Sequence, residues 1–270
     1  MTIARSLLFL LAVLSLRAQS PWLPRPGQII LTPGYSHQSF TGIWMGSHPA
    51  NLPASVGQKT GTITAEVGLS SNLAADFTVG YTSTGSAAFG PHSSDSGLTD
   101  TTMGLRWKIN NERGSRWAPT MTLRAGGIIR GTYQPNRPFS AGDGASGVEL
   151  SVLLGKAFGE TGFGAYSETG YRMRDHNVPE DLFGSAGLYK SLRGATLSVG
   201  YRHTQALSGM DIGDPGFTFP RLKEIVQLME GGFGFSSGPR RYHQFFCAKS
   251  VAGRNTGDKL IFGFTTSFSF

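Results

Sequence analysis

The chain contains little charge and almost no cysteine. Charged residues make up 15% of its 270 residues, against about 25% in an ordinary soluble domain. Its single cysteine, Cys247, excludes an intramolecular disulfide. After residue 18, no apolar run reaches the roughly 20 residues that a transmembrane helix needs. Two classes of protein stay open: a soluble protein, or one that crosses a membrane with strands.

What the chain does have is glycine, with 38 residues, and a moderate hydrophobic content of 39%. This composition is typical of a barrel wall, in which apolar residues face lipid and small polar residues face the interior. The formal net charge is +7. Because the basic residues are scattered singly, a nucleic-acid partner is not expected. Inside a barrel or at its mouth, they would instead favour anionic solutes or lipopolysaccharide phosphates.

The N-terminal residues 1–18, MTIARSLLFLLAVLSLRA, have the pattern of a secretory signal peptide. Arg5 supplies the positive charge, and Ser6 to Leu16 form an apolar stretch too short to span a bilayer. Ala18 offers a cleavage position before Gln19. The segment predicts export from the cytoplasm.

The C-terminal residues alternate between large apolar and small side chains. A period of two residues places the two sets on opposite faces of a strand. In a barrel wall, lipid would cover the apolar face. A terminal aromatic residue on such a strand resembles the recognition signal of the bacterial barrel-assembly machinery, and we assign that role to Phe270 and Phe268. The apolar set is Leu260, Phe262, Phe264, Phe268 and Phe270.

Alternation recurs along the chain in about twelve segments, although ten to fourteen strands fit the pattern. We therefore predict an all-β protein, an antiparallel up-and-down transmembrane β-barrel. It has a signal peptide over 1–18, a short periplasmic segment over 19–27 and the barrel over 28–270. The predicted strands are 28–40, 58–70, 73–84, 98–110, 116–131, 145–158, 162–174, 180–192, 195–206, 221–236, 240–252 and 257–270.

The linkers between these segments alternate in length, as short periplasmic turns and longer outer loops do in bacterial barrels. This asymmetry predicts an outer-membrane barrel with both termini in the periplasm and outer-membrane lipid around it. The long linkers are 41–57, 85–97, 132–144 and 207–220. The short ones are Ser71-Asn72, Asn111 to Gly114, Gly159 to Thr161, Arg193-Gly194 and Ser237 to Pro239.

Parity also places charged residues of both signs on the inner face, because a charge facing lipid at the midplane would cost about 2–4 kcal/mol. They form either a salt-bridged interior or a polar channel, and Glu224, Glu230 and Arg241 are expected to join them. The predicted lumen-lining residues are Glu66, Asp76, Asp100, Arg106, Lys108, Arg124, Arg130, Glu149, Glu168, Arg172, Arg174 and Arg202.

The sequence contains few motifs that are typical of catalytic or metal-binding sites. Barrel lipid hydrolases pair a Ser nucleophile with a His base. The best candidate is His203, but Thr204 and Gln205 depart from the His-x-Ser-Asn pattern, and parity places His203 off the luminal face. His243 is expected to be luminal or at the rim. No metal-ligand spacing is present. We therefore expect no enzyme activity, no catalytic residues, no cofactor and no metal.

Residues 58–109 resemble the outer-membrane barrel family named for the meta-cleavage pathway of phenol degradation. The resemblance rests on Leu69-Ser70-Ser71-Asn72-Leu73, Phe77-Thr78-Val79-Gly80-Tyr81 and a following strand in which Gly97, Asp100, Gly104 and Leu105 match. It covers about a fifth of the chain. It implies an outer-membrane barrel that passes small organic compounds, and it carries over no functional residues.

The leading hypothesis is therefore a porin-like or transporter-like barrel that passes a small organic solute through a polar lumen. Three alternatives stay open. One is a sealed structural or adhesive barrel that works through its outer loops. The others are a lipid-modifying outer-membrane enzyme and a soluble periplasmic β-protein.

Overall fold

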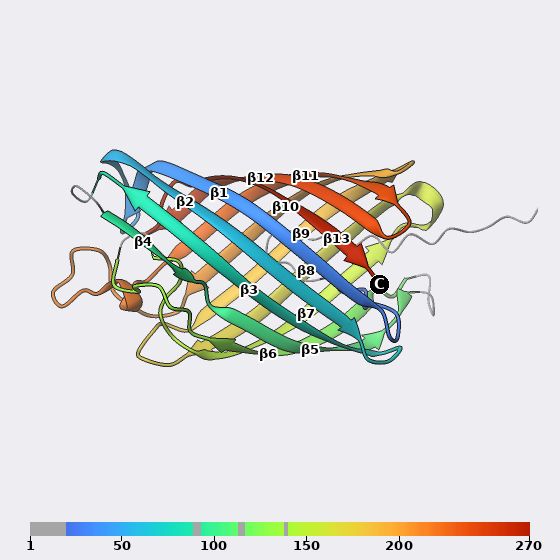
Figure 1. Ribbon diagram of the computed structural model, residues 1–270. Coiled ribbons are helices and arrows are strands. Elements are labelled where there is room, and N and C mark those ends of the chain that lie inside the picture. Colours follow the sequence, from blue (N-terminus) through green and yellow to red (C-terminus); the bar gives the residue numbers. More distant parts are fainter. Residues whose placement is uncertain (1–19, 89–92, 113–116, 138–139) are drawn as a thin grey trace, which may run out of the picture.

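The computed structural model describes residues 20–88, 93–112, 117–137 and 140–270. The signal peptide predicted over 1–18 lies outside these residues. Among them, no helix is long and apolar enough to cross a membrane. The chain forms a closed antiparallel barrel of twelve strands, with strands tilted steeply across the wall (Figure 1).

Each strand pairs with its neighbours in sequence, which confirms the predicted up-and-down topology. Two labelled strands, β4 and β5, both pair with β3 and together form one position in the wall. The strands are β1 (Ile29–Met45), β2 (His48–Gly68), β3 (Leu73–Ser86), β4 (Ser93–Leu98), β5 (Thr101–Asn110), β6 (Thr120–Ile129), β7 (Gly147–Ala157), β8 (Phe163–Arg174), β9 (Asp181–Leu192), β10 (Ala195–Ala206), β11 (Ile225–Gly238), β12 (Arg241–Arg254) and β13 (Leu260–Ser269).

The barrel closes where β13 pairs with β1. Phe270 takes part in this closure, because its N–H donates to the carbonyl of Ile29 at 2.9 Å. Closure satisfies the backbone groups that a sheet edge would leave open, and a strand wall in lipid depends on it. Phe270 thus contributes a backbone hydrogen bond to the closed wall.

The wall has two chemically different faces, as the period of two predicts. On β6, Thr120, Thr122 and Arg124 are almost fully buried, whereas Ile129 is half exposed. On β13, Phe264 is 46% exposed and Ser267 only 6%. Large apolar side chains therefore cover the outside, and polar side chains fill the inside.

The connections divide the barrel into two ends, which we call the turn end and the loop end. The turn end carries short links such as Arg193-Gly194 and Pro239-Arg240, and the C-terminus lies there (Figure 1). The loop end carries residues 130–146, 175–180, 207–224 and 255–259. The loop 207–224 contains a short 3-10 turn, η3 (Phe219–Arg221), and η2 (Gly159–Thr161) lies at the turn end.

One predicted long loop is wrong. Residues 41–57 are not a loop, because β1 and β2 continue to Met45 and His48 as a two-stranded ribbon. Only Gly46 and Ser47 form the turn, and Gly46 has a positive φ of 56°. Strands that extend past the apolar band are held by backbone pairing and need no alternation of apolar residues. The pattern therefore could not reveal them.

Glycines facing the interior make room for aromatic rings on neighbouring strands. Gly164 of β8 pairs with Tyr189 of β9, and Tyr166 pairs with Gly187. A Cβ atom at Gly187 would lie 2.4 Å from the Tyr166 hydroxyl, and one at Gly164 would lie 2.2 Å from the Tyr189 ring. Each ring thus covers the glycine opposite, and both tyrosines are buried.

We predict that Gly187→Val destabilises the barrel by about 1–3 kcal/mol, because the new side chain displaces the Tyr166 ring. Adding Tyr166→Ala should recover part of this loss, so that the double variant is more stable than the sum of the single effects. Gly61→Val is the matched control, since nothing lies within 4 Å of a Cβ there. Urea unfolding in detergent micelles measures all four. Additive effects would contradict the packing argument.

Candidate functional site: the barrel interior

The charged side chains of β2, β3 and β5 to β9 join into one chain of alternating sign, which we call the ion ladder. Arg124 lies near its middle, with Nη2 2.8 Å from Asp76 Oδ1 and Nη1 bonded to Glu149. Arg172 extends the chain, at 3.2 Å from both Glu149 and Asp181. In order of contact, the ion ladder is Glu66, Arg106, Asp76, Arg124, Glu149, Arg172 and Asp181.

The register of the sheet explains how Arg124 reaches two carboxylates. Its guanidinium lies over two glycines, since a Cβ on Gly104 or Gly126 would be 2.8 Å from its nitrogens. Glu149 pairs across the sheet with Gly126, which is the next inward-facing residue after Arg124 on β6. Small residues thus leave the space into which the large cation folds.

Pairing is what allows these charges to be buried. Arg106 and Arg124 are 1% and 3% exposed. An ion buried to this extent without a counter-charge would lose its hydration at a cost of several kcal/mol. The intact network contributes little net stability, because desolvation offsets attraction. Removal of one member is costly, because its partners stay buried without a counter-charge.

A second cluster of charges lies towards the loop end. Arg174 Nη1 is 3.1 Å from Asp100 and 3.2 Å from Asp143 of the loop 130–146. Tyr133 of the same loop is buried, donates its hydroxyl to Asp100 and accepts the Gly144 N–H at 2.8 Å. Burial, with the hydrogen bond to Asp100, raises the pKa of Tyr133 well above its usual range. This cluster ties the loop 130–146 to the wall.

The loops at this end also contact one another. The Phe219 N–H of the loop 207–224 donates to Asn136 of the loop 130–146 at 3.1 Å. Asn255 donates to Asp211 at 2.7 Å and accepts the Gly46 N–H at 2.7 Å. The hydrogen bonds from Arg254 and Asn255 lower the pKa of Asp211. Loops from opposite parts of the wall thus meet over the mouth.

The N-terminal segment 20–25 lies inside the barrel at the turn end. Its carbonyl groups at Ser20 and Pro21 accept hydrogen bonds from Arg106 at 3.2 Å and Thr122 at 2.7 Å. Trp22 donates its indole N–H to Glu112 at 2.9 Å and packs edge-on against Tyr189. A polar wall accepts this segment because its backbone acceptors meet side-chain donors.

The glycine at position 155 of the wall leaves space for the N-terminal segment. A Cβ on Gly155 would lie 2.5 Å from Pro21 and 2.7 Å from Trp22. The segment predicted over 19–27 is therefore, from residue 20 onward, held against the inner wall. Sequence periodicity could not place it, because a stretch with no regular structure has no period. Its one signal is the clustering of Pro21, Trp22 and Pro24 before β1.

The wall formed by β9 to β12 is different. Arg202 pairs with Glu230 at 2.7 Å, and few other charged side chains face inward from these strands. Five buried atoms on their inward-facing side chains make no hydrogen bond within the described part of the chain, as is also true of Arg106 Nε and Arg174 Nε on the other wall. The five are Arg202 Nε, Glu230 Oε1, Gln244 Oε1, Ser185 Oγ and Ser191 Oγ.

Most of the predicted lumen-lining residues lie in this interior. Glu168 is buried and accepts a hydrogen bond from Ser151 at 2.9 Å. Lys108 is half-buried, and Arg130 is exposed one residue beyond β6. The rest are members of the clusters described above. Sequence alternation did not identify four further inward-facing or interior residues. Asp181 lies in a segment whose apolar residues do not alternate clearly, and Asp143 lies in a loop. Gln244 and Ser185 carry no charge.

The expectation that Arg241 joins the inward charges is wrong. Arg241 and His243 lie on the outer face of β12, since Gln244, Phe246 and Ala248 are its buried set. Of the two positions expected for His243, the luminal one is therefore wrong, whereas its place as the third residue of β12 lies close to the turn end. Phe245 and Phe246 give this strand apolar residues of both parities, so the pattern alone could not choose the face. Glu230 lies inside as expected, and Glu224 lies before β11, within 3.7 Å of Lys259.

The histidine candidates form no hydrolytic site among the described residues. His203 lies on the outer face of β10, where its ring contacts Gln205 at 3.3 Å. His243 contacts the Ser237 hydroxyl at 2.7 Å and the Thr266 hydroxyl at 3.0 Å. A threonine hydroxyl is a poor substitute for the carboxylate that stabilises a catalytic imidazolium. No group of three or more metal-ligating side chains occurs in the described segments.

Comparison with solved structures agrees with this architecture. An outer membrane channel from Pseudomonas putida F1 superposes with a TM-score of 0.75 at 14% identity, over 92% of this chain and 97% of that one. The KdgM porin superposes with a TM-score of 0.50 at 6% identity, over 88% and 99% of the two chains. No family model matches the chain, and no curated protein matches it in sequence. At these identities the likeness establishes the barrel fold.

We predict that Arg124→Met destabilises the barrel by about 3–5 kcal/mol, because Asp76 and Glu149 lose a shared counter-charge while buried. Lys249→Met is the control, since Lys249 and Asp258 form an exposed pair worth at most about 1 kcal/mol. The urea midpoint of heat-modifiable migration in gels reports both. An equal, small effect of the two substitutions would contradict the ion ladder.

The raised pKa of Tyr133 predicts a pH dependence of stability. A raised pKa means that the folded state favours the protonated hydroxyl, so its contribution is complete below the unfolded pKa of about 10 and is lost above it. The thermal midpoint of the native chain should therefore fall more steeply between about pH 10 and 12 than that of Tyr133→Phe. Tyr81→Phe, on the exposed outer face, should follow the native curve. Parallel curves for all three would refute the assignment.

Proposed function

We propose that this barrel resides in the bacterial outer membrane and passes a small organic solute through its polar interior. The observation that carries the proposal is the polar inner face of β9 to β12, on which Ser185, Arg202, Glu230 and Gln244 point into the barrel. A path lined by a few polar groups that fix orientation is the usual arrangement of a solute-binding interior.

The two walls divide the interior by role. The ion ladder pairs its charges with one another and holds the N-terminal segment. On the other wall, Arg202 and Glu230 supply guanidinium donors and carboxylate acceptors, and Ser185 and Gln244 add a hydroxyl and an amide. This wall presents both hydrogen-bond signs, which suits a neutral solute with polar groups better than a strongly charged one.

The comparison with solved structures supports a channel role without specifying the solute. The neighbour with a TM-score of 0.75 is an outer membrane channel, and the second is a porin. We propose the same kind of activity for this chain, with membership of the meta-pathway barrel family as the accompanying prediction. The turn end would face the periplasm, which would place both termini there.

Assembly is part of the same proposal. Export through the signal peptide would deliver the chain to the barrel-assembly machinery, which would recognise the terminal strand. Phe270 is 68% exposed on the outer face, next to the seam between β13 and β1. Phe268 lies on the same face, so both rings are accessible to a partner at closure.

A second candidate function is a sealed barrel that works through its outer loops. The observation that favours it is the contact between the loops 130–146 and 207–224 over the mouth, together with the N-terminal segment at the other end. A lipid-modifying enzyme is less well supported, because His203 contacts only an amide side chain, and the Ser237–His243 pair has the Thr266 hydroxyl where a carboxylate would orient the imidazole.

The channel is tested by solute uptake in liposomes. We predict that the native protein admits small neutral polyols, and that Ser185→Trp lowers the rate by about tenfold or more by narrowing the lumen. Ala186→Trp is the matched control, because Ala186 is the next residue on β9 and faces outward. Its rate should equal that of the native barrel.

Two results would contradict the proposal in different ways. An absence of both uptake and conductance in planar bilayers would favour the sealed barrel. Uptake that is unaffected by Ser185→Trp would move the path away from the β9 to β12 wall.

A further inference from the structure

The outer face of β11, β12 and β13 near the turn end is ordered into three rows by strand register. The first row contains Arg241 and Phe268, which pair across the sheet, and the second contains Phe235, His243 and Thr266. The third contains only phenylalanine, namely Phe233, Phe245 and Phe264. From the turn inward, the side chains thus change from charged to polar to apolar.

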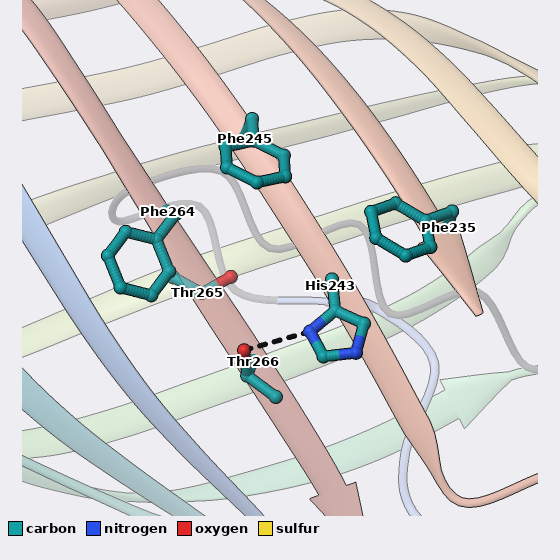
Figure 2. Close-up of a pocket in the computed structure, with 6 residues that line it drawn as sticks. All are labelled: Phe235, His243, Phe245, Phe264, Thr265 and Thr266. Atoms are coloured by element: carbon teal, nitrogen blue, oxygen red, sulfur yellow. Dashed lines mark hydrogen bonds between the residues drawn. The ribbon is translucent and has the colours of Figure 1, made fainter. Parts of the chain in front are cut away.

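The second and third rows enclose a hollow on the outside of the wall. Figure 2 shows the rings of Phe235, Phe245 and Phe264 around the position where His243 and Thr266 are joined by a hydrogen bond. Phe233, Phe245 and Phe264 are each 44–53% exposed. The surface of the hollow is mainly apolar, with His243 and Thr266 at its polar edge, where the His243 ring also contacts the Ser237 hydroxyl.

The charge of this surface has one sign. Arg241 is exposed, lies 6.0 Å from the centre of the Phe268 ring and forms no ion pair within the described residues. Arg240 is exposed beside it in the turn. The flanking strands add Leu197, Tyr35 and Leu31 at the corresponding positions, so no carboxylate faces these rows.

We propose that this surface binds one anionic phospholipid, with its phosphate at Arg240 and Arg241 and an acyl chain against the three phenylalanines. The order of the rows matches the order of phosphate, glycerol ester and chain along a lipid. Outward residues two apart are about 7 Å apart along a strand, which at a tilt of roughly 35–45° corresponds to about 5 Å of depth, so Arg241, His243 and Phe245 lie at three successive levels. The hydroxyls of Ser237 and Thr266 stand at the ester level.

The proposal predicts a preference for anionic headgroups. Native mass spectrometry of the detergent-solubilised barrel, titrated with phosphatidylglycerol or with phosphatidylcholine, measures it. The native barrel should retain one phosphatidylglycerol in preference to phosphatidylcholine. Arg240→Gln with Arg241→Gln should reduce that preference by roughly 30-fold, because each basic residue near an anionic lipid surface contributes about fivefold.

Two further variants make the result specific. Lys59→Gln with Lys249→Gln removes two exposed outward-facing charges elsewhere on the barrel and should leave the preference unchanged. Phe245→Ala with Phe264→Ala should weaken both lipids equally, because the chain contact is common to them. Heat-modifiable migration confirms that each variant is folded. Equal retention of the two lipids by the native barrel, or equal effects of the arginine and lysine pairs, would overturn the proposal.

Discussion

The constraint on which this barrel depends is that a charge buried inside its wall needs a counter-charge within reach. Arg124 illustrates it: its guanidinium occupies space left by Gly104 and Gly126 and contacts Asp76 and Glu149. Because Asp76 and Glu149 are each shared between two arginines and the terminal Glu66 and Asp181 each pair with one, none of the strands that carry the ion ladder can shift in register without breaking a pair. The ion ladder therefore fixes register on the inner face, where polar residues alone would specify it weakly.

The same constraint explains where the N-terminal segment lies. Arg106 has donors left over after pairing with Glu66, and one of them binds the carbonyl of Ser20. The segment follows the wall that has spare donors, and the glycine at 155 gives it room. On β10 to β12, the inward-facing charges are limited to Arg202 and Glu230, which pair with each other. The distribution of charges among the strands thus divides the wall into one part that holds the N-terminal segment and one that does not.

The sequence predicted the fold well because a barrel wall repeats one simple rule, the alternation of outward apolar and inward polar residues. It predicted strand number, closure at Phe270 and the inward charges for that reason. It could not reveal the β1–β2 ribbon, whose strands beyond Phe40 are held by backbone pairing with each other and by hydrogen bonds to residues 255–258. Nor could it identify which charges pair, since Arg174 meets Asp100 and Asp143 from strands and loops far apart in sequence.

On the outer face, unlike the inner face, a charged side chain at a strand end needs no counter-charge from the protein. Two arginines illustrate the difference. Arg202 lies within β10 and faces inward, so it requires Glu230 as a partner. Arg241 begins β12 and faces outward, where only the membrane interface lies within reach of its charge. A long side chain at a strand end can place its charge at headgroup level while its stem covers apolar surface. The position of an outward-facing charge along its strand therefore decides whether the charge is unfavourable or can contact lipid headgroups. Arg241, His243 and Phe245 follow this order along β12, from charged to polar to apolar.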